Sequence, residues 1–198
     1  MTKPMLPRLG AACGIVFPIA LFLAAGNGSH FTPWRAVAAT WALVLALPFL
    51  AYLCSMLRAA EGDGGWLSTV ALMAGVSGVL LKLTSHAPEL AIHRDGIGKG
   101  TELYKALDNS AGAATVMSLY PLAVCCAAVA VIALREHVLP RWLGIFAAVT
   151  AVALAVNAGF LYASFVPALL LFLLWTLATS IVLLRRSRST QARVAYST

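Results

Sequence analysis

The sequence predicts an all-α, polytopic transmembrane helical bundle with six spans and both termini in the cytoplasm. Two observations support this class: 61% of the 198 residues are hydrophobic, and only 11% are charged. Soluble domains carry about 25% charged residues, so a soluble fold of this length could not cover its surface with so few charged side chains. Disorder is excluded because disordered chains are poor in apolar residues. Four cysteines in a chain of this length do not indicate a disulfide scaffold.

Six apolar stretches are long enough to cross a bilayer, since about 20 helical residues at roughly 1.5 Å each span the hydrocarbon core. Their predicted bounds are 9–26, 36–57, 66–85, 111–134, 142–161 and 164–184. The last two spans come from one uncharged stretch of 43 residues, Trp142 to Leu184, which is too long for a single crossing. Helix breakers around Asn157 and at Pro167 divide it, and we expect a tight turn near Tyr162.

The first span also has features of a cleavable signal peptide, with Lys3 and Arg8 in front and Ala24-Ala25-Gly26 behind. We expect it to be retained, because the other spans are equally rich in alanine. Residues 86–110 are predicted to form an external helical hairpin. Residues 185–198 are predicted to form a cytoplasmic tail that frays from Ser189. Residues 1–198 would then be a single membrane domain.

Lysine and arginine are distributed unequally between the two predicted sides. The cytoplasmic side holds nine of them: Lys3, Arg8, Arg58, Arg135, Arg141, Arg185, Arg186, Arg188 and Arg193. The external side holds five, Arg35, Lys82, Arg94, Lys99 and Lys105, almost balanced by Glu89, Asp95, Glu102 and Asp108. Cytoplasmic loops are enriched in basic residues, so this bias predicts the N-in, C-in orientation. The formal charge of +7 therefore reflects topology, and we expect no nucleic-acid partner.

Ionisable residues gather in the predicted external hairpin. Lys82, His86, Glu89 and His93 are 4, 3 and 4 residues apart. At about 100° per residue they share one face of a continued helix, although Pro88 would kink it. After a glycine-rich turn, a second face carries the residues Glu102, Lys105, Asn109 and Tyr120. Two antiparallel helices would present these faces to each other.

The two faces allow three interpretations. The first is acid–base chemistry, in which a carboxyl at the edge of an apolar cavity donates a proton. Its candidate catalytic residues are Glu89, Glu102 and Asp108, and its candidate substrate-binding residues are Lys82, His86, His93, Asn109, Tyr120 and Trp41. The second is a metal site, but the spacing of the histidines matches no known signature and a fourth ligand is lacking, so we expect no metal and no cofactor. The third is a wet hairpin whose charges merely pair, at about 0–1 kcal/mol each.

Three other features have competing interpretations. Lys82 either extends to the membrane surface or forms a salt bridge with Glu102 or Asp108. The Gly75-Val76-Ser77-Gly78 segment resembles the motif of rhomboid proteases, but no histidine occurs in spans four to six to activate the serine. Gly10 and Gly14 form a small-residue motif that is typical of a packing or dimer face.

Two short motifs carry a family resemblance. Leu139-Pro140-Arg141-Trp142-Leu143-Gly144 opens the fifth span, and Leu103-Tyr104-Lys105-Ala106-Leu107-Asp108 leads into the fourth. With these motifs the chain resembles a group of uncharacterised six-span membrane proteins of high-GC bacteria. The resemblance implies a fold and a bacterial inner-membrane location, without an activity. A looser similarity to small integral-membrane terpene cyclases implies protonation of an isoprenoid by a carboxylic acid.

Together these observations predict a protein that binds or transforms a lipid-like or isoprenoid molecule in a cavity of the bundle, with acid–base residues at its external mouth. Its expected partners are membrane lipid and a hydrophobic small molecule. The alternative is a non-catalytic transporter, resistance protein or accessory membrane subunit.

Overall fold

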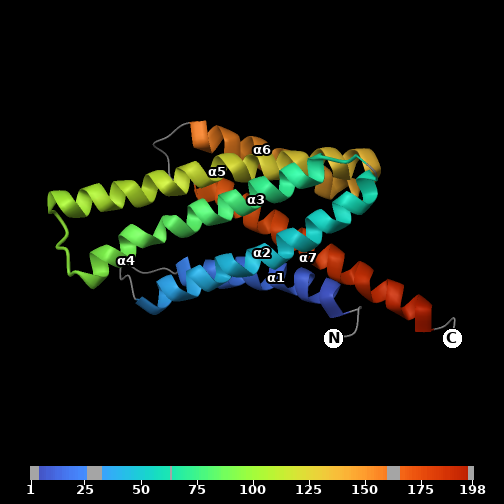
Figure 1. The fold of residues 1–198 in the computed structure, drawn as a ribbon, viewed down its shortest axis with the longest axis horizontal. Helices are drawn as coiled ribbons and strands as arrows, with labels where there is room; N and C mark the ends of the chain where they lie inside the picture. The colour runs from blue at the N-terminus through green and yellow to red at the C-terminus, as the bar shows by residue number, and fades with distance from the viewer. Residues whose placement is uncertain (1–4, 26–32, 63, 160–165, 196–198) are drawn as a thin grey trace.

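The computed structural model describes residues 5–25, 33–62, 64–159 and 166–195, and their regular secondary structure is entirely α-helical (Figure 1). The helices are α1 (Met5–Ala25), α2 (Pro33–Glu61), α3 (Leu67–Thr84), α4 (His86–Arg94), α5 (Glu102–Glu136), α6 (Arg141–Gly159) and α7 (Val166–Ala195). The predicted all-α class is therefore confirmed for the described part of the chain.

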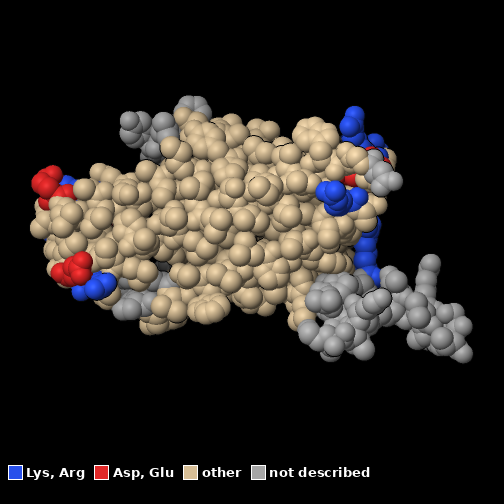
Figure 2. Space-filling model, in the orientation of Figure 1, with Lys and Arg blue, Asp and Glu red and all other residues tan. Residues whose placement is uncertain are grey.

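Within these ranges, five stretches are long and apolar enough to cross a membrane. They are Val37–Glu61, Leu67–Arg94, Glu102–Glu136, Arg141–Gly159 and Pro167–Arg186, and a shorter apolar helix covers Arg8–Ala24. Figure 2 shows Lys, Arg, Asp and Glu at the two ends of the molecule, with a broad uncharged band between them on the face in view. This distribution is typical of a membrane protein.

The six long helices form a closed ring. α1 packs on α2, α2 on α3, α3 on α5, α5 on α6, α6 on α7, and α7 returns to α1. The short helix α4 lies against the first turns of α5, and this pair projects beyond the other helices at one end (Figure 1). With 35 residues, α5 is about 52 Å long, which exceeds the roughly 30 Å of a hydrocarbon core.

Small residues bring α3 and α5 close together. A side-chain carbon added at Gly78 would lie 2.6 Å from Leu122 Cγ and 3.2 Å from the carbonyl oxygen of Ser118. Glycine at this position therefore permits a close helix approach, as small residues do in membrane bundles. Ser77 is exposed on another face of α3. The protease-like motif is thus a packing motif.

Gly10 and Gly14 also face the interior of the bundle. A carbon added at Gly10 would lie 2.5 Å from Tyr52 Cβ, and one at Gly14 would overlap Phe49 and Ser180. Of the two interpretations of this motif, the structure supports packing of α1 on α2 and α7.

The helix is interrupted between α3 and α4, at Ser85. Pro88 explains this position, because its missing N–H leaves the carbonyl of Thr84 without a helical partner and its ring clashes with that carbonyl. The turn between α4 and α5 uses Gly96 (φ +62°) and Gly100 (φ +105°), and such angles are readily adopted by glycine alone. Thr101 then caps α5 by accepting a 3.1 Å hydrogen bond from the Tyr104 N–H.

The predicted bounds differ from the helices in one important place. α7 continues through Ala195, beyond Ser189, the residue from which the sequence predicts that the tail frays. The Gln-Ala-Arg-Val-Ala segment there contains no glycine or proline, which allows the helix to continue. The turn expected near Tyr162 lies outside the described residues.

Candidate functional site

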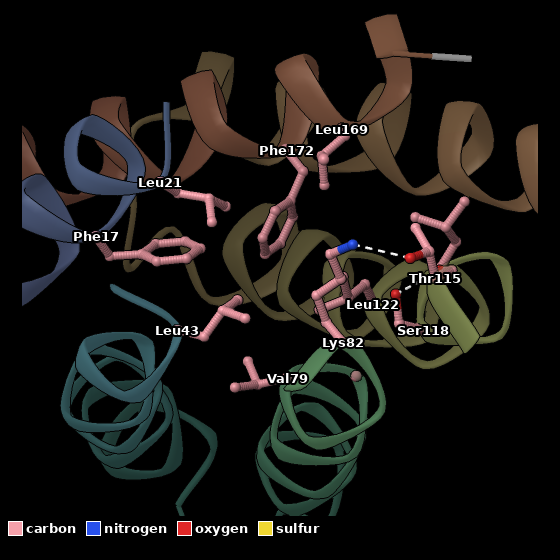
Figure 3. Close-up of a pocket in the computed structure, with 12 residues that line it drawn as sticks. Phe17, Leu21, Leu43, Val79, Lys82, Thr115, Ser118, Leu122, Leu169 and Phe172 are labelled. Atoms are coloured by element: carbon pink, nitrogen blue, oxygen red, sulfur yellow. Dashed lines mark hydrogen bonds between the residues drawn. The ribbon is translucent and has the colours of Figure 1, made fainter. Parts of the chain in front are cut away.

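A small cavity lies inside the ring of helices, in the half of the bundle nearer to α4. Its volume is about 30 Å³, and it is partly open. The lining residues come from α1, α2, α3, α5 and α7 (Figure 3): Phe17, Leu21, Leu43, Gly78, Val79, Lys82, Thr115, Ser118, Leu119, Leu122, Leu169 and Phe172. Among these, a single side chain carries a charge, that of Lys82.

The packing of the ring explains the position of this cavity. Within the described residues, α7 packs on α1 and α6 and does not pack extensively on α3 or α5, so the centre of the ring is filled by side chains alone. Gly78 provides none, and Phe172 reaches in from α7 (Figure 3). One turn further along α7, the fully buried Trp175 fills the interior, with its ring centre 6.0 Å from that of Phe172.

Lys82 directs its ammonium group across the cavity towards α5. Its Nζ donates a 2.8 Å hydrogen bond to Thr115 Oγ1, and Ser118 Oγ donates a 2.6 Å bond to the Thr115 carbonyl (Figure 3). Lys82 lies fifteen residues after the start of α3, or about 22 Å along the helix. The partly buried ammonium is thus held inside the bundle by Thr115.

No salt bridge joins Lys82 to Glu102 or Asp108, so this alternative is not observed. Among the described residues, no carboxylate oxygen lies within 4.0 Å of its ammonium group. Glu89 on α4 attracts Lys82 from beyond 4.0 Å and is itself repelled by Asp108. Glu89 is half-buried, whereas Asp108 is exposed.

The expected stripe of four residues is divided by the break at Ser85. His86 is only 9% exposed, and its Nδ1 lies 3.5 Å from the hydroxyl of Thr40, which links α4 to α2. His93, near the end of α4, is exposed. Of the stripe, only Lys82 lines the cavity. In the described part of the chain, no three His, Cys, Asp or Glu side chains converge on a point that could hold a metal ion.

The second predicted face lies on the outer part of the hairpin. Glu102 has a side chain that is 89% exposed, and it pairs with Lys105 at 2.8 Å within the same helix. Asn109 is also exposed. This arrangement is that of a solvated surface, and it does not bring Glu102, Asp108 or Asn109 to the cavity.

Two further candidates have other environments. Trp41 is 65% exposed, so it lies on the outer surface of α2. Tyr120 donates a 2.9 Å hydrogen bond to the carbonyl oxygen of Ala158, which connects α5 to α6. Neither residue lines the cavity. His30, which the sequence suggested could join the ionisable cluster, lies outside the described residues.

Most residues of the cavity wall were not predicted from the sequence. Thr115, Ser118, Leu119 and Leu122 follow the i, i+3, i+4, i+7 pattern of one helix face, and all four line the cavity. Two hydroxyl groups on one face of an otherwise apolar span were a usable signal, because polar groups in a membrane need partners. No feature of the sequence around Phe17 or Phe172 indicates that these side chains line a cavity.

Comparisons with protein-family models, with curated proteins and with solved structures found no match to this chain.

Proposed function

We propose that this chain is a six-span protein of the bacterial inner membrane, with both termini in the cytoplasm, that binds one end of a lipid-like or isoprenoid molecule in the cavity of the ring. The observation that carries this proposal is a lysine ammonium group inside a partly open, otherwise apolar cavity between helices. Pockets between the helices of bundles are common ligand sites, and ionisable groups inside membrane bundles commonly mark function.

The charge distribution supports the topology. α1 begins and α7 ends at the same end of the molecule (Figure 1), as an even number of crossings requires. Figure 2 shows blue basic side chains at that end. Its exposed basic residues include Arg58, Arg135, Arg141, Arg185 and Arg186. A cytoplasmic location for this end follows the enrichment of Lys and Arg on the inner side.

Cysteine labelling tests this topology. Lys99→Cys, in the α4–α5 turn, should react with a membrane-impermeant maleimide in intact cells, whereas Arg141→Cys should react only after lysis. The native Cys54, Cys125 and Cys126 are buried and give little background, and the partly buried Cys13 is replaced by alanine in both labelling variants. The reverse pattern of labelling would contradict the orientation.

The size of the cavity limits what it can enclose. About 30 Å³ has room for one or two water molecules, whereas pockets that enclose a drug-sized ligand measure about 300–1,000 Å³. The ring therefore holds a small head group, and the remainder of the ligand lies along the apolar helix surfaces towards the lipid.

A pair of neighbouring leucines on α7 allows a direct test. Leu169 lines the cavity, and Leu170 is 37% exposed outside it. The ligands are oleate, oleyl alcohol and geranylgeraniol, each added to the purified protein in maltoside micelles. At least one should raise the Tm of the wild type and of Leu170→Trp, but not of Leu169→Trp, because the larger ring fills the cavity. Absence of any shift, or an equal shift in Leu169→Trp, would refute binding in the cavity.

Glu89 favours a second candidate function, proton transfer to the bound molecule. Glu89 is half-buried and interacts electrostatically with Lys82, whereas Glu102 and Asp108 are exposed. Membranes that contain the protein would be incubated with isoprenoid substrates, and the products analysed. Glu89→Gln should abolish turnover, while Glu102→Gln and Asp108→Asn should retain it. Equal turnover in Glu89→Gln would leave binding without acid catalysis.

A further inference from the structure

We propose that the ligand of this cavity is an amphiphile with an anionic oxygen-acid head, a carboxylate or a phosphate monoester, held by Lys82 and Thr115. This inference rests on the proposed function, and it names the class of molecule that the site takes.

The charged hydrogen-bonding group among the residues that line the cavity is a donor, the ammonium of Lys82. A lysine ammonium has three N–H donors, and Lys82 uses one of them on Thr115 Oγ1. Thr115 Oγ1 accepts that bond, so its own hydroxyl hydrogen is available as a further donor. Ser118 uses its hydroxyl hydrogen on the carbonyl of Thr115. The other lining residues have apolar side chains or, at Gly78, none. A ligand atom that contacts the ammonium must therefore be a hydrogen-bond acceptor, because an ammonium group donates and cannot accept.

The charge of the site points to an anion. A cation inside a membrane bundle is costly unless a negative group compensates it. Glu89 attracts Lys82 only from beyond 4 Å, so no carboxylate of the described residues contacts the ammonium directly. An oxyanion in the cavity would contact the ammonium directly and form charge-assisted hydrogen bonds, which are about twice as strong as neutral ones. The same ammonium would repel a cationic ligand.

The shape of the wall supports a chain attached to that head. Phe17, Leu21, Leu169 and Phe172 line the cavity on the sides formed by α1 and α7 (Figure 3). The cavity is large enough for a small head group alone, so the first methylene groups of the ligand would contact these apolar side chains. Free phosphate would gain the ionic contact and lose this apolar contact, and a fatty alcohol would gain only the latter.

Four additives separate these contributions: oleate, dodecyl phosphate, oleyl alcohol and inorganic phosphate. Each is titrated into the full-length protein in maltoside micelles, with the Tm shift as the measurement. Wild type should bind oleate or dodecyl phosphate about tenfold or more tightly than oleyl alcohol, because the alcohol makes no ion pair. Tight binding of inorganic phosphate alone would show a simple anion site and would overturn the amphiphile proposal.

Variants identify the residue responsible. Lys82→Met should lose the preference for the anion while still binding oleyl alcohol, and Lys82→Arg should retain the preference. Lys105→Met serves as the matched control, since this exposed lysine pairs with Glu102 away from the cavity. An unchanged preference in Lys82→Met would overturn the inference but leave the proposed function standing. If no chain-bearing additive binds in a way that Leu169→Trp abolishes, the proposed function fails as well.

Discussion

Two lysines in the same half of the molecule lie in opposite surroundings. Lys105 lies on the outer hairpin, where its side chain is 59% exposed and pairs with Glu102. Lys82 lies inside the ring, where its ammonium contacts the neutral Thr115 and no carboxylate of a described residue lies within 4.0 Å. The two residues are similar in sequence context, since both belong to a stripe of ionisable residues on a helix face.

The difference shows where charge carries information in this molecule. An exposed pair such as Lys105–Glu102 contributes about 0–1 kcal/mol and needs no explanation beyond solubility. An ammonium held among leucines and phenylalanines opposes stability unless something compensates it. The hairpin, which concentrates the acids of the sequence, is thus a surface feature, and Lys82, the proposed ligand-binding residue, lies one turn before it.

The largest expected effect separates the packed ring from the open hairpin. Gly78→Leu should lower the free energy of unfolding by about 3 kcal/mol, because the new side chain collides with Leu122 and the backbone at Ser118. Gly112→Leu on α5 is the control, since an added carbon there meets nothing within 4 Å. Thermal unfolding in micelles measures both variants. Equal losses would mean that the close approach of α3 and α5 does not stabilise the ring.

The next effect compares the two lysines in the absence of ligand. Lys82→Met should raise the free energy of unfolding by about 1–2 kcal/mol, because it removes a charge from an apolar site at similar volume. Lys105→Met should change it by less than about 1 kcal/mol. The same unfolding assay applies. A marked loss of stability in Lys82→Met would show that the ammonium is already well compensated, and would weaken the case for an anionic ligand.

A hydrogen bond between ring helices gives a smaller effect. Tyr120→Phe should cost about 1 kcal/mol, because it leaves the buried carbonyl of Ala158 without the tyrosine hydroxyl. Tyr52→Phe should have little effect, since no described hydrogen bond uses the hydroxyl of Tyr52. Both variants should keep the Tm shift with oleate. Loss of that shift in Tyr120→Phe would indicate that Tyr120 takes part in ligand binding after all.

The smallest effect belongs to the hairpin. Thr101→Ala removes the cap of α5 and should cost about 0.5–1 kcal/mol. Because Thr101 lies far along the hairpin from the cavity, ligand affinity should not change. A parallel loss of stability and oleate affinity would indicate that the hairpin is coupled to the cavity.

The sequence predicted the helices well, because apolar runs of membrane length and glycine-rich turns are local signals. The Gly96–Gly100 turn and the disturbance at Pro88 are examples, although the actual break lies at Ser85, where the missing N–H of the proline takes effect. The C-terminal bound of α7 was harder to predict, because neither glycine nor proline follows Leu184 where the charged residues begin.

The site could be predicted only in part. Lys82 was identified because a charged residue near the end of a membrane span is rare. This can be recognised without knowing which residue contacts the lysine. The contact with Thr115, 33 residues away, depends on how α3 packs against α5. No local sequence pattern predicts that packing. Trp41 was expected to line a cavity but lies on the outer surface of α2, because the face that a helix buries also depends on its packing.

Photocrosslinking identifies the residues that contact the ligand and shows whether Lys82 holds it in the cavity. A fatty acid with a diazirine near its carboxylate would be bound to the wild type and to Lys82→Met, irradiated, and the labelled residues mapped by mass spectrometry. The account predicts labelling of cavity residues such as Phe17, Thr115 and Phe172 in the wild type, and its loss in Lys82→Met and under competition by oleate. Labelling spread over exposed helix faces, unchanged by the substitution, would contradict it.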